Sequence, residues 1–293
     1  MAGRSHPESE GPRPRWRPPP LLGLSAGLHA AAVTALAVSP AAWPWTVATL
    51  VLNHLGLCAA GMAPRSRLLG PNLSRLPEPL ASQGRVAVTF DDGPDPEVTP
   101  RVLDLLGESG ATATFFAIGR RADAHPGLVA EIARRGHRVE NHTYRHAYSF
   151  AFHGPGTQGR DLDAAQDCVE RITGRRPSYV RAPAGFRNPW LDLVLVRRGL
   201  RLVSWTRRGY DTVDADPRRV AGRLVKGLAA GDVLLLHDGS AARGADGRPV
   251  VLEALPRLLD AIAERGLRPA FLPEKADFAG QIPPDPPFSK GGT

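Results

Sequence analysis

Acidic and histidine side chains follow two largely apolar segments of the chain, at the points where strands would end. The segment 85–90 (RVAVTF) runs into Asp91 and Asp92, and the segment 232–236 (DVLLL) runs into His237. A pair of carboxylates beside a buried strand is costly unless something binds them, although an ordinary Asp-Gly turn would also place an aspartate there. The pattern favours a site that binds a cation or transfers a proton.

Two histidines follow a third predicted strand, around 137–141. His142 and His146 are four residues apart. On a helical turn this spacing places both side chains on one face, where they can bind the same metal ion. An isolated pair with this spacing is more often incidental than functional. Whether the pair indicates a metal site therefore depends on the other polar residues at the strand ends.

Two further polar residues occupy comparable positions. Arg181 ends a predicted strand at 178–181, and Asp211 follows the predicted strand 201–205 after a short gap. In barrel enzymes the site is built at the carboxyl ends of the strands. Each signal alone is modest, but five of them on one rim of a barrel together indicate a catalytic site.

The elements that must position these residues form a regular alternation between 84 and 273. Strands are predicted at 85–90, 111–118, 137–141, 178–181, 201–205, 232–236 and 269–272, and helices at 100–107, 125–135, 159–174, 189–198, 217–229 and 251–265. Alternating strands and helices predict a parallel sheet. A full eight-unit barrel typically takes about 250 residues. Seven predicted strands in about 190 residues fall short of this. The expected fold is α/β, a distorted (β/α)7-type barrel.

The region before this domain is apolar. We interpret 21–63 as a membrane hairpin, because two apolar runs of nearly bilayer-spanning length flank a break at Pro40 and Pro44. A signal peptide and a pair of surface-lying helices are the alternatives. Arginines at both ends of the hairpin place the following domain on the cytoplasmic face of a bacterial inner membrane, if both runs span it.

The remaining divisions follow from composition. We expect a disordered basic tail over 1–20, a linker over 64–83 and a proline-rich disordered tail over 274–293. The formal net charge of +8 suits an anionic partner such as a lipid headgroup, but it equally fits a bias toward arginine. No basic run is interleaved with aromatic residues, so nucleic-acid binding is not expected. Cys58 and Cys168 are too few for a disulfide framework or a cysteine-based zinc site.

One further motif is discounted. The segment 154–159 (GPGTQG) matches the dinucleotide fingerprint GxGxxG. It lies some distance after the third predicted strand, and no acidic residue follows about 20 residues later. We interpret it as a loop.

The ordered set of motifs resembles the polysaccharide deacetylase family, the NodB-homology domain of carbohydrate esterases. The segments that carry the resemblance are TFDDGP (89–94), HTYRH (142–146), RAPAG (181–185), GYD (209–211) and LLLHD (234–238). The resemblance covers residues 84–273 and implies a distorted (β/α) barrel with a divalent metal, usually zinc, with cobalt or nickel as substitutes.

The resemblance also assigns roles to individual residues. It implies that Asp92, His142 and His146 bind the metal and that Asp91 is the general base. It further implies that His237 is the general acid, that Arg181 orients the base and that Asp211 holds the acid protonated. The expected reaction is hydrolysis of the N-acetyl group of an amino sugar.

Two motifs depart from the family's usual pattern. The third contains Ala182 and Ala184, and in the fourth Asp211 is followed by Thr212. Bulkier residues usually stand at these positions, so the departures leave the identity of the sugar open. The hairpin and the basic charge make a deformylase or deacylase of a lipid-linked amino sugar the first alternative. A catalytically inactive sugar-binding module is the second, disfavoured because every residue needed for hydrolysis is present.

Overall fold

The computed structural model describes residues 16–273. The tails predicted at 1–20 and 274–293 lie outside the described residues, except for 16–20. Helix α1 already begins at Pro20, the last of three consecutive prolines.

The described residues form eight strands, one more than predicted. They are β1 (Arg85–Asp91), β2 (Thr114–Ala117), β3 (Arg138–Asn141), β4 (Tyr179–Val180), β5 (Arg201–Leu202), β6 (Arg207–Arg208), β7 (Val233–His237) and β8 (Arg268–Ala270). Their order in the sheet is β5-β4-β3-β2-β1-β7-β6, and β8 pairs with β1. Every strand pair for which a register is defined is parallel. The α/β class is confirmed, with the distorted barrel present as a curled parallel sheet.

The helices agree with most of the predicted positions. They are α1 (Pro20–Val38), α2 (Trp43–Met62), α3 (Glu78–Ala81), α4 (Val98–Glu108), α5 (Gly119–Ala124), α6 (Pro126–Arg134), α7 (Pro155–Thr173), α8 (Leu191–Val196), α9 (Pro217–Val225) and α10 (Val251–Glu264). The loop predicted at 154–159 is wrong, because α7 begins at Pro155. A proline is tolerated in the first turn of a helix, where its missing N–H has no intrahelical partner.

The contacts divide the described chain into two compact units. The first contains 16–74, 116–126 and 140–205, and the second contains 75–115, 127–139 and 206–273.

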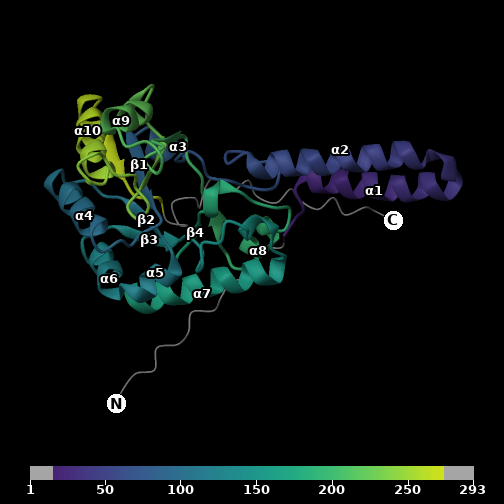
Figure 1. Cartoon of the computed structure of the whole chain (residues 1–293), viewed down its shortest axis with the longest axis horizontal. Coiled ribbons are helices and arrows are strands. Elements are labelled where there is room, and N and C mark those ends of the chain that lie inside the picture. Colours follow the sequence, from purple (N-terminus) through teal and green to yellow (C-terminus); the bar gives the residue numbers. More distant parts are fainter. Residues whose placement is uncertain (1–15, 274–293) are drawn as a thin grey trace, which may run out of the picture. The chain divides into compact units, whose positions relative to one another are not determined.

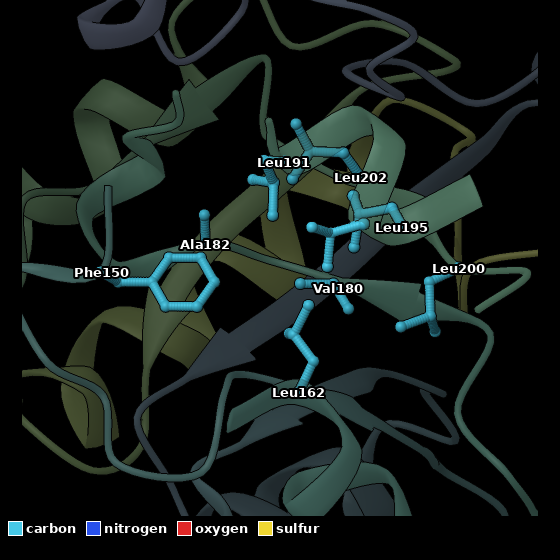
Figure 2. Packing of buried hydrophobic residues seen from close by; sticks show 9 residues of the cluster. Phe150, Leu162, Val180, Ala182, Leu191, Leu195, Leu200 and Leu202 are labelled. Atoms are coloured by element: carbon cyan, nitrogen blue, oxygen red, sulfur yellow. The ribbon is translucent and has the colours of Figure 1, made fainter. Parts of the chain in front are cut away.

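The first unit has a core of aliphatic side chains around β4. Val180 is fully buried, and Figure 2 shows it among leucines of α7, α8 and β5. Phe150 and Ala182 complete this cluster and are 1% and 2% exposed. Ala182 directly follows Arg181, so the packing of the cluster fixes where the third motif begins.

The hairpin of α1 and α2 belongs to the first unit. Figure 1 shows the two helices side by side, joined by a 3-10 turn at Pro40–Ala42. Both are long and apolar enough to cross a membrane. Within the pair, the amide of Asn53 donates a hydrogen bond of 2.9 Å to the hydroxyl of Ser25. Such a bond is typical of helices that associate in an apolar medium.

The chain that leaves α2 is packed against the domain. The backbone N–H of Arg187 donates to the carbonyl of Gly61 at 3.1 Å, and a Cβ at Gly61 would lie only 2.2 Å from the Arg187 carbonyl oxygen. Further along, Leu69 is fully buried and Leu73 forms a parallel bridge with Val203. The end of the hairpin is therefore joined to the domain by direct backbone contacts.

Glu140 on β3 holds the start of the neighbouring strand. Its carboxylate accepts hydrogen bonds from the backbone N–H groups of Ser178 and Tyr179 at 2.7 and 2.9 Å and pairs with Arg175 at 2.6 Å. Burial raises the pKa of this carboxyl, and the charge of Arg175 and the hydrogen bonds oppose that shift. The side chain is 2% exposed, so its partners replace water almost completely.

We expect Glu140→Ala to lower the free energy of unfolding by about 3 kcal/mol, because two buried N–H groups lose their acceptor and a charge pair is broken. Urea denaturation at pH 7 measures this loss. Arg134→Ala, which breaks an exposed pair with Glu131, is the control and should change stability by no more than about 0.5 kcal/mol. Equal effects of the two substitutions would contradict this role of Glu140.

The second unit is built on the pairing of β1 with β7. Ala87, Val88, Thr89 and Phe90 lie opposite Val233, Leu234, Leu235 and Leu236. The hydroxyl of Thr89 is satisfied by the carbonyl of Leu234 at 2.7 Å. A continuous apolar run on both strands is what a parallel sheet covered on both faces requires. The pairing fixes the level at which both strands end.

Candidate functional site

Asp91 and His237 end neighbouring strands at the same level. They are directly paired in the register of β1 and β7, and the N–H of Asp238 donates to the carbonyl of Asp91 at 3.2 Å. Asp91 is 3% and His237 5% exposed. The structure thus places the predicted base and the predicted acid on adjacent strand ends.

Asp211 holds His237 through both of its carboxylate oxygens. One lies 2.9 Å from Nδ1 of the imidazole, and the other accepts the backbone N–H of His237 at 2.7 Å. Burial by itself lowers the pKa of His237, but the hydrogen bond and charge of Asp211, aided by Asp91 and Asp92, raise it above its ordinary value. The imidazolium is the form that can give a proton to a leaving group.

Asp211→Asn is expected to lower kcat/KM about 10²-fold at neutral pH and to move its high-pH limb to lower pH. Burial lowers the pKa of His237, and the hydrogen bond and charge of Asp211 raise it. In the variant only the smaller contributions of Asp91 and Asp92 still oppose burial, so the pKa falls. The protonated form is then lost at lower pH. The profile of kcat/KM against pH measures the shift.

Asp214→Asn provides the matched control for this experiment. The same exchange is made three residues along, at a carboxylate whose partners are Arg219 and Arg223. It should leave the pH profile in place. An unmoved high-pH limb in Asp211→Asn would show that this carboxylate does not set the protonation of His237.

Asp92, His142 and His146 form the group of side chains suited to a metal ion. One ligand atom from each lies within 4.8 Å of the others, and the two imidazole centroids are 4.7 Å apart. Asp92 and His142 are buried, whereas His146 is partly exposed. The structure brings together the three residues predicted as metal ligands.

The local conformation of the two histidines differs from the prediction. Residues 142–146 do not form a helical turn. Thr143 and His146 have φ values of 61° and 51°, in the left-handed region. Side-chain hydrogen bonds stabilise this loop: the N–H of Thr143 donates to the Asn141 amide oxygen at 2.8 Å, and the N–H of His146 donates to the Thr143 hydroxyl at 3.1 Å. The expectation of a shared helical face is wrong, although the two imidazoles still lie close together.

The donor set fits a divalent transition metal. Nδ1 of His142 lies 2.8 Å from the carbonyl oxygen of Arg181, which can only accept, so Nδ1 carries the proton and Nε2 keeps its lone pair. Histidine ligands of metals commonly donate their other N–H to a carbonyl in this way. Two imidazoles and one carboxylate leave coordination positions for water and substrate, as in catalytic zinc sites.

Arg181 is fully buried in the first unit. Its guanidinium lies over the Phe116 ring at 4.1 Å and donates to the carbonyl of Ser204 at 3.0 Å. Nearby, Ala184 adopts a left-handed conformation with φ of 54°, followed by Gly185 at 73°. The orientation of Asp91 by Arg181 stays a prediction from the resemblance.

Asp238 is a feature of the site that the sequence reasoning did not single out. It is 1% exposed and accepts a hydrogen bond of 2.6 Å from the Thr99 hydroxyl. Burial raises its pKa to about 7, and the charges of Asp92 and Asp91 add to the effect. A Cβ at Gly93 would lie 2.2 Å from its carboxylate, so the loop after β1 can pass only with glycine there. In the sequence, the position of Asp238 directly after His237 was the feature that could have indicated its place in the site.

Comparison with known proteins agrees with this arrangement. The polysaccharide deacetylase family model matches residues 80–203. A peptidoglycan-N-acetylglucosamine deacetylase of Bacillus cereus is 33% identical over 185 residues, 62% of this chain and 84% of the relative. A chitooligosaccharide deacetylase of Azorhizobium caulinodans is 34% identical over 206 residues, 66% of this chain and 94% of the relative.

A solved structure extends the likeness to the fold. A peptidoglycan N-acetylglucosamine deacetylase in complex with 4-naphthalen-1-yl-N-oxidanyl-benzamide has a TM-score of 0.62 and 27% identity, covering 69% of this chain and 91% of the other. The carboxylate–histidine group, the paired Asp91 and His237 and these matches lead to one assignment. The chain belongs to the polysaccharide deacetylase family.

Proposed function

We propose that the protein hydrolyses the N-acetyl group of an amino sugar in a glycan of the cell envelope. The observation that carries the proposal is the gathering of Asp92, His142 and His146 into one group of ligand atoms within 4.8 Å. The placement of Asp91 beside His237 supplies the two proton-transfer groups that amide hydrolysis needs. The two relatives are named as deacetylases of peptidoglycan N-acetylglucosamine and of chitooligosaccharides.

The three ligands would hold a divalent ion, zinc in our proposal, with cobalt or nickel as substitutes. When bound, such an ion polarises the amide carbonyl and makes water more acidic. Asp91 takes the proton of the attacking water, and His237 gives a proton to the nitrogen as the C–N bond breaks. Amide and water thus become free amine and acetate.

Two further groups have supporting roles in this scheme. Arg181 would orient Asp91, a role that the family resemblance assigns to it. A backbone N–H near Ala184 would donate a hydrogen bond to the oxygen that gains charge during attack. The left-handed conformation of Ala184 is consistent with this role, because strained backbone commonly occurs at functional sites.

The hairpin favours a second candidate substrate. Two helices of membrane-spanning length are joined to the domain through backbone contacts such as that between Gly61 and Arg187. This arrangement supports a membrane-anchored enzyme, on the bacterial inner membrane in our proposal, with a lipid-linked amino sugar as an alternative substrate. A deformylase or deacylase would use the same metal and proton-transfer groups. Arginines at both ends of the hairpin favour the cytoplasmic face.

The experiment that tests the proposal is acid release by the zinc-loaded, full-length protein. Acetate and formate are measured separately, on N-acetylated chitooligosaccharides and on lipid-linked N-acylated amino sugars. We expect acetate from the oligosaccharides. Acid released only from the lipid-linked substrates would instead support the second candidate. Oligosaccharide binding without any acid release would support an inactive sugar-binding module.

A further inference from the structure

The segment that follows the second histidine ligand displays two aromatic side chains. Tyr148 is 83% and Phe152 89% exposed, whereas Phe150 between them is 1% exposed and belongs to the core cluster of the first unit. Figure 2 shows Phe150 with Val180 and Ala182 in this cluster. The buried ring therefore anchors the segment, while its neighbours remain at the surface.

Hydrogen bonds hold the backbone of residues 147–152, which carries the two exposed rings. The N–H of Phe150 donates to the Ala147 carbonyl at 2.9 Å, and the N–H of Phe152 donates to that of Ser149 at 2.8 Å. The side-chain amide of Gln158, itself fully buried, donates to the Phe150 carbonyl at 3.1 Å. A ring on a fixed backbone loses little conformational entropy when a ligand binds against it.

Tyr148 is also in contact with the site. Its ring meets that of His146 edge to face, with centroids 5.8 Å apart. Single exposed aromatic residues are common on protein surfaces and need no explanation. Tyr148 differs because its exposed ring contacts His146, a partly exposed member of the proposed metal-binding group, so a sugar bound at that group lies near the ring.

The geometry restricts what can lie on this ring. In the proposed reaction the amide carbonyl oxygen would be bound beside His146, one of the three residues that would hold the ion. The sugar ring that carries the amide is only a few bonds from that oxygen, so it or its neighbour comes within reach of Tyr148. The C–H face of a pyranose is flat and apolar, and it matches the face of an aromatic ring.

We propose that Tyr148 is a sugar-binding residue, on whose ring the pyranose at or next to the scissile amide stacks. The assignment rests on the proposed function and names how its substrate is recognised. The ring is exposed for this contact, Phe150 fixes the segment, and the contact with His146 sets its distance from the metal ligands. Tyr148 acts in binding and takes no part in proton transfer.

Steady-state kinetics on N-acetylated chitooligosaccharides, with the zinc-loaded full-length protein, tests this assignment. We expect Tyr148→Ala to raise KM about 5- to 10-fold with kcat changed less than about 2-fold. Tyr148→Phe, which keeps the ring, should restore the KM, and Tyr148→Leu, which keeps apolar bulk, should not. Equal KM values in all three variants, or restoration by leucine, would overturn the proposal.

Equilibrium binding separates this proposal from the proposed function. Calorimetry of chitooligosaccharides with zinc-loaded protein that carries Asp91→Asn measures the sugar contact with little turnover, because this exchange removes the proposed base. A Kd raised about 5- to 10-fold by Tyr148→Ala supports the role of Tyr148 even if no acetate is released. Unchanged oligosaccharide affinity together with weaker association with phospholipid vesicles would overturn it and assign the ring to the membrane surface instead.

Discussion

Exchanging Asp91 for asparagine is expected to lower kcat by about 10²- to 10⁴-fold while the protein keeps its metal. This range is the usual contribution of a general base placed against the reacting proton. Asparagine has nearly the same size as aspartate but cannot take up the proton of water. Asp91 ends β1 opposite His237 and is 3% exposed, so little solvent is available to replace the carboxylate.

The measurement pairs single-substrate kinetics with the metal content of each purified variant. Asp95→Asn is the matched control, because the same exchange is made four residues along. Asp95 accepts the N–H groups of Glu97 and Val98 at the start of α4, and asparagine serves at such a position nearly as well. Unchanged turnover in Asp91→Asn would refute the assigned base. Loss of metal together with activity would instead place Asp91 among the ligands.

The strands that carry the site were predictable because each is an apolar run long enough to be distinguished from its surroundings. β1 and β7 are continuous buried segments, and both end at a polar residue of the site. Parallel strands bring their carboxyl ends to one edge, so the paired positions of Asp91 and His237 follow from recognising two such strands. β6 was missed because it consists of two arginines and has no apolar pattern.

The conformation of residues 142–146 was not predicted from the spacing of the two histidines. His142 and His146 have the spacing of a helical turn, yet a helix does not form. The conformation depends on Asn141 and Thr143 side chains that bind the backbone, and on the carbonyl of Arg181, 39 residues away from His142. Short polar side chains that bind nearby backbone compete with helix formation. The conformation thus combines local side-chain hydrogen bonds with one tertiary partner, and the spacing of the two histidines alone does not reveal it.

The contacts of the segment that follows the hairpin were likewise not predictable from the sequence. Residues 64–83 have the proline-rich composition of a linker, but Leu69 is fully buried and Leu73 bridges to Val203. Arg75 further pairs with Asp232 at 2.8 Å. Isolated leucines and arginines between prolines show no periodicity, so the sequence carries no pattern from which these contacts could be inferred.

Removing the metal is expected to abolish turnover, and restoring zinc is expected to recover it. His142 keeps its Nδ1 proton on the Arg181 carbonyl, so its Nε2 can bind the ion only while the imidazole is neutral. Asp92 must be ionised for the same reason. Metal affinity should therefore fall as the pH is lowered, because protons compete with the ion for these ligand atoms.

Dialysis against a chelator, with activity and metal content read before and after, tests this dependence. We expect His142→Gln and Asp92→Asn each to lose both metal and activity. His125→Gln is the control, because His125 follows α5 and is not one of the three clustered ligands. It should keep both properties. Full turnover in protein shown to be free of metal would refute the metal-dependent mechanism, since Asp91 and His237 would then suffice for the hydrolysis.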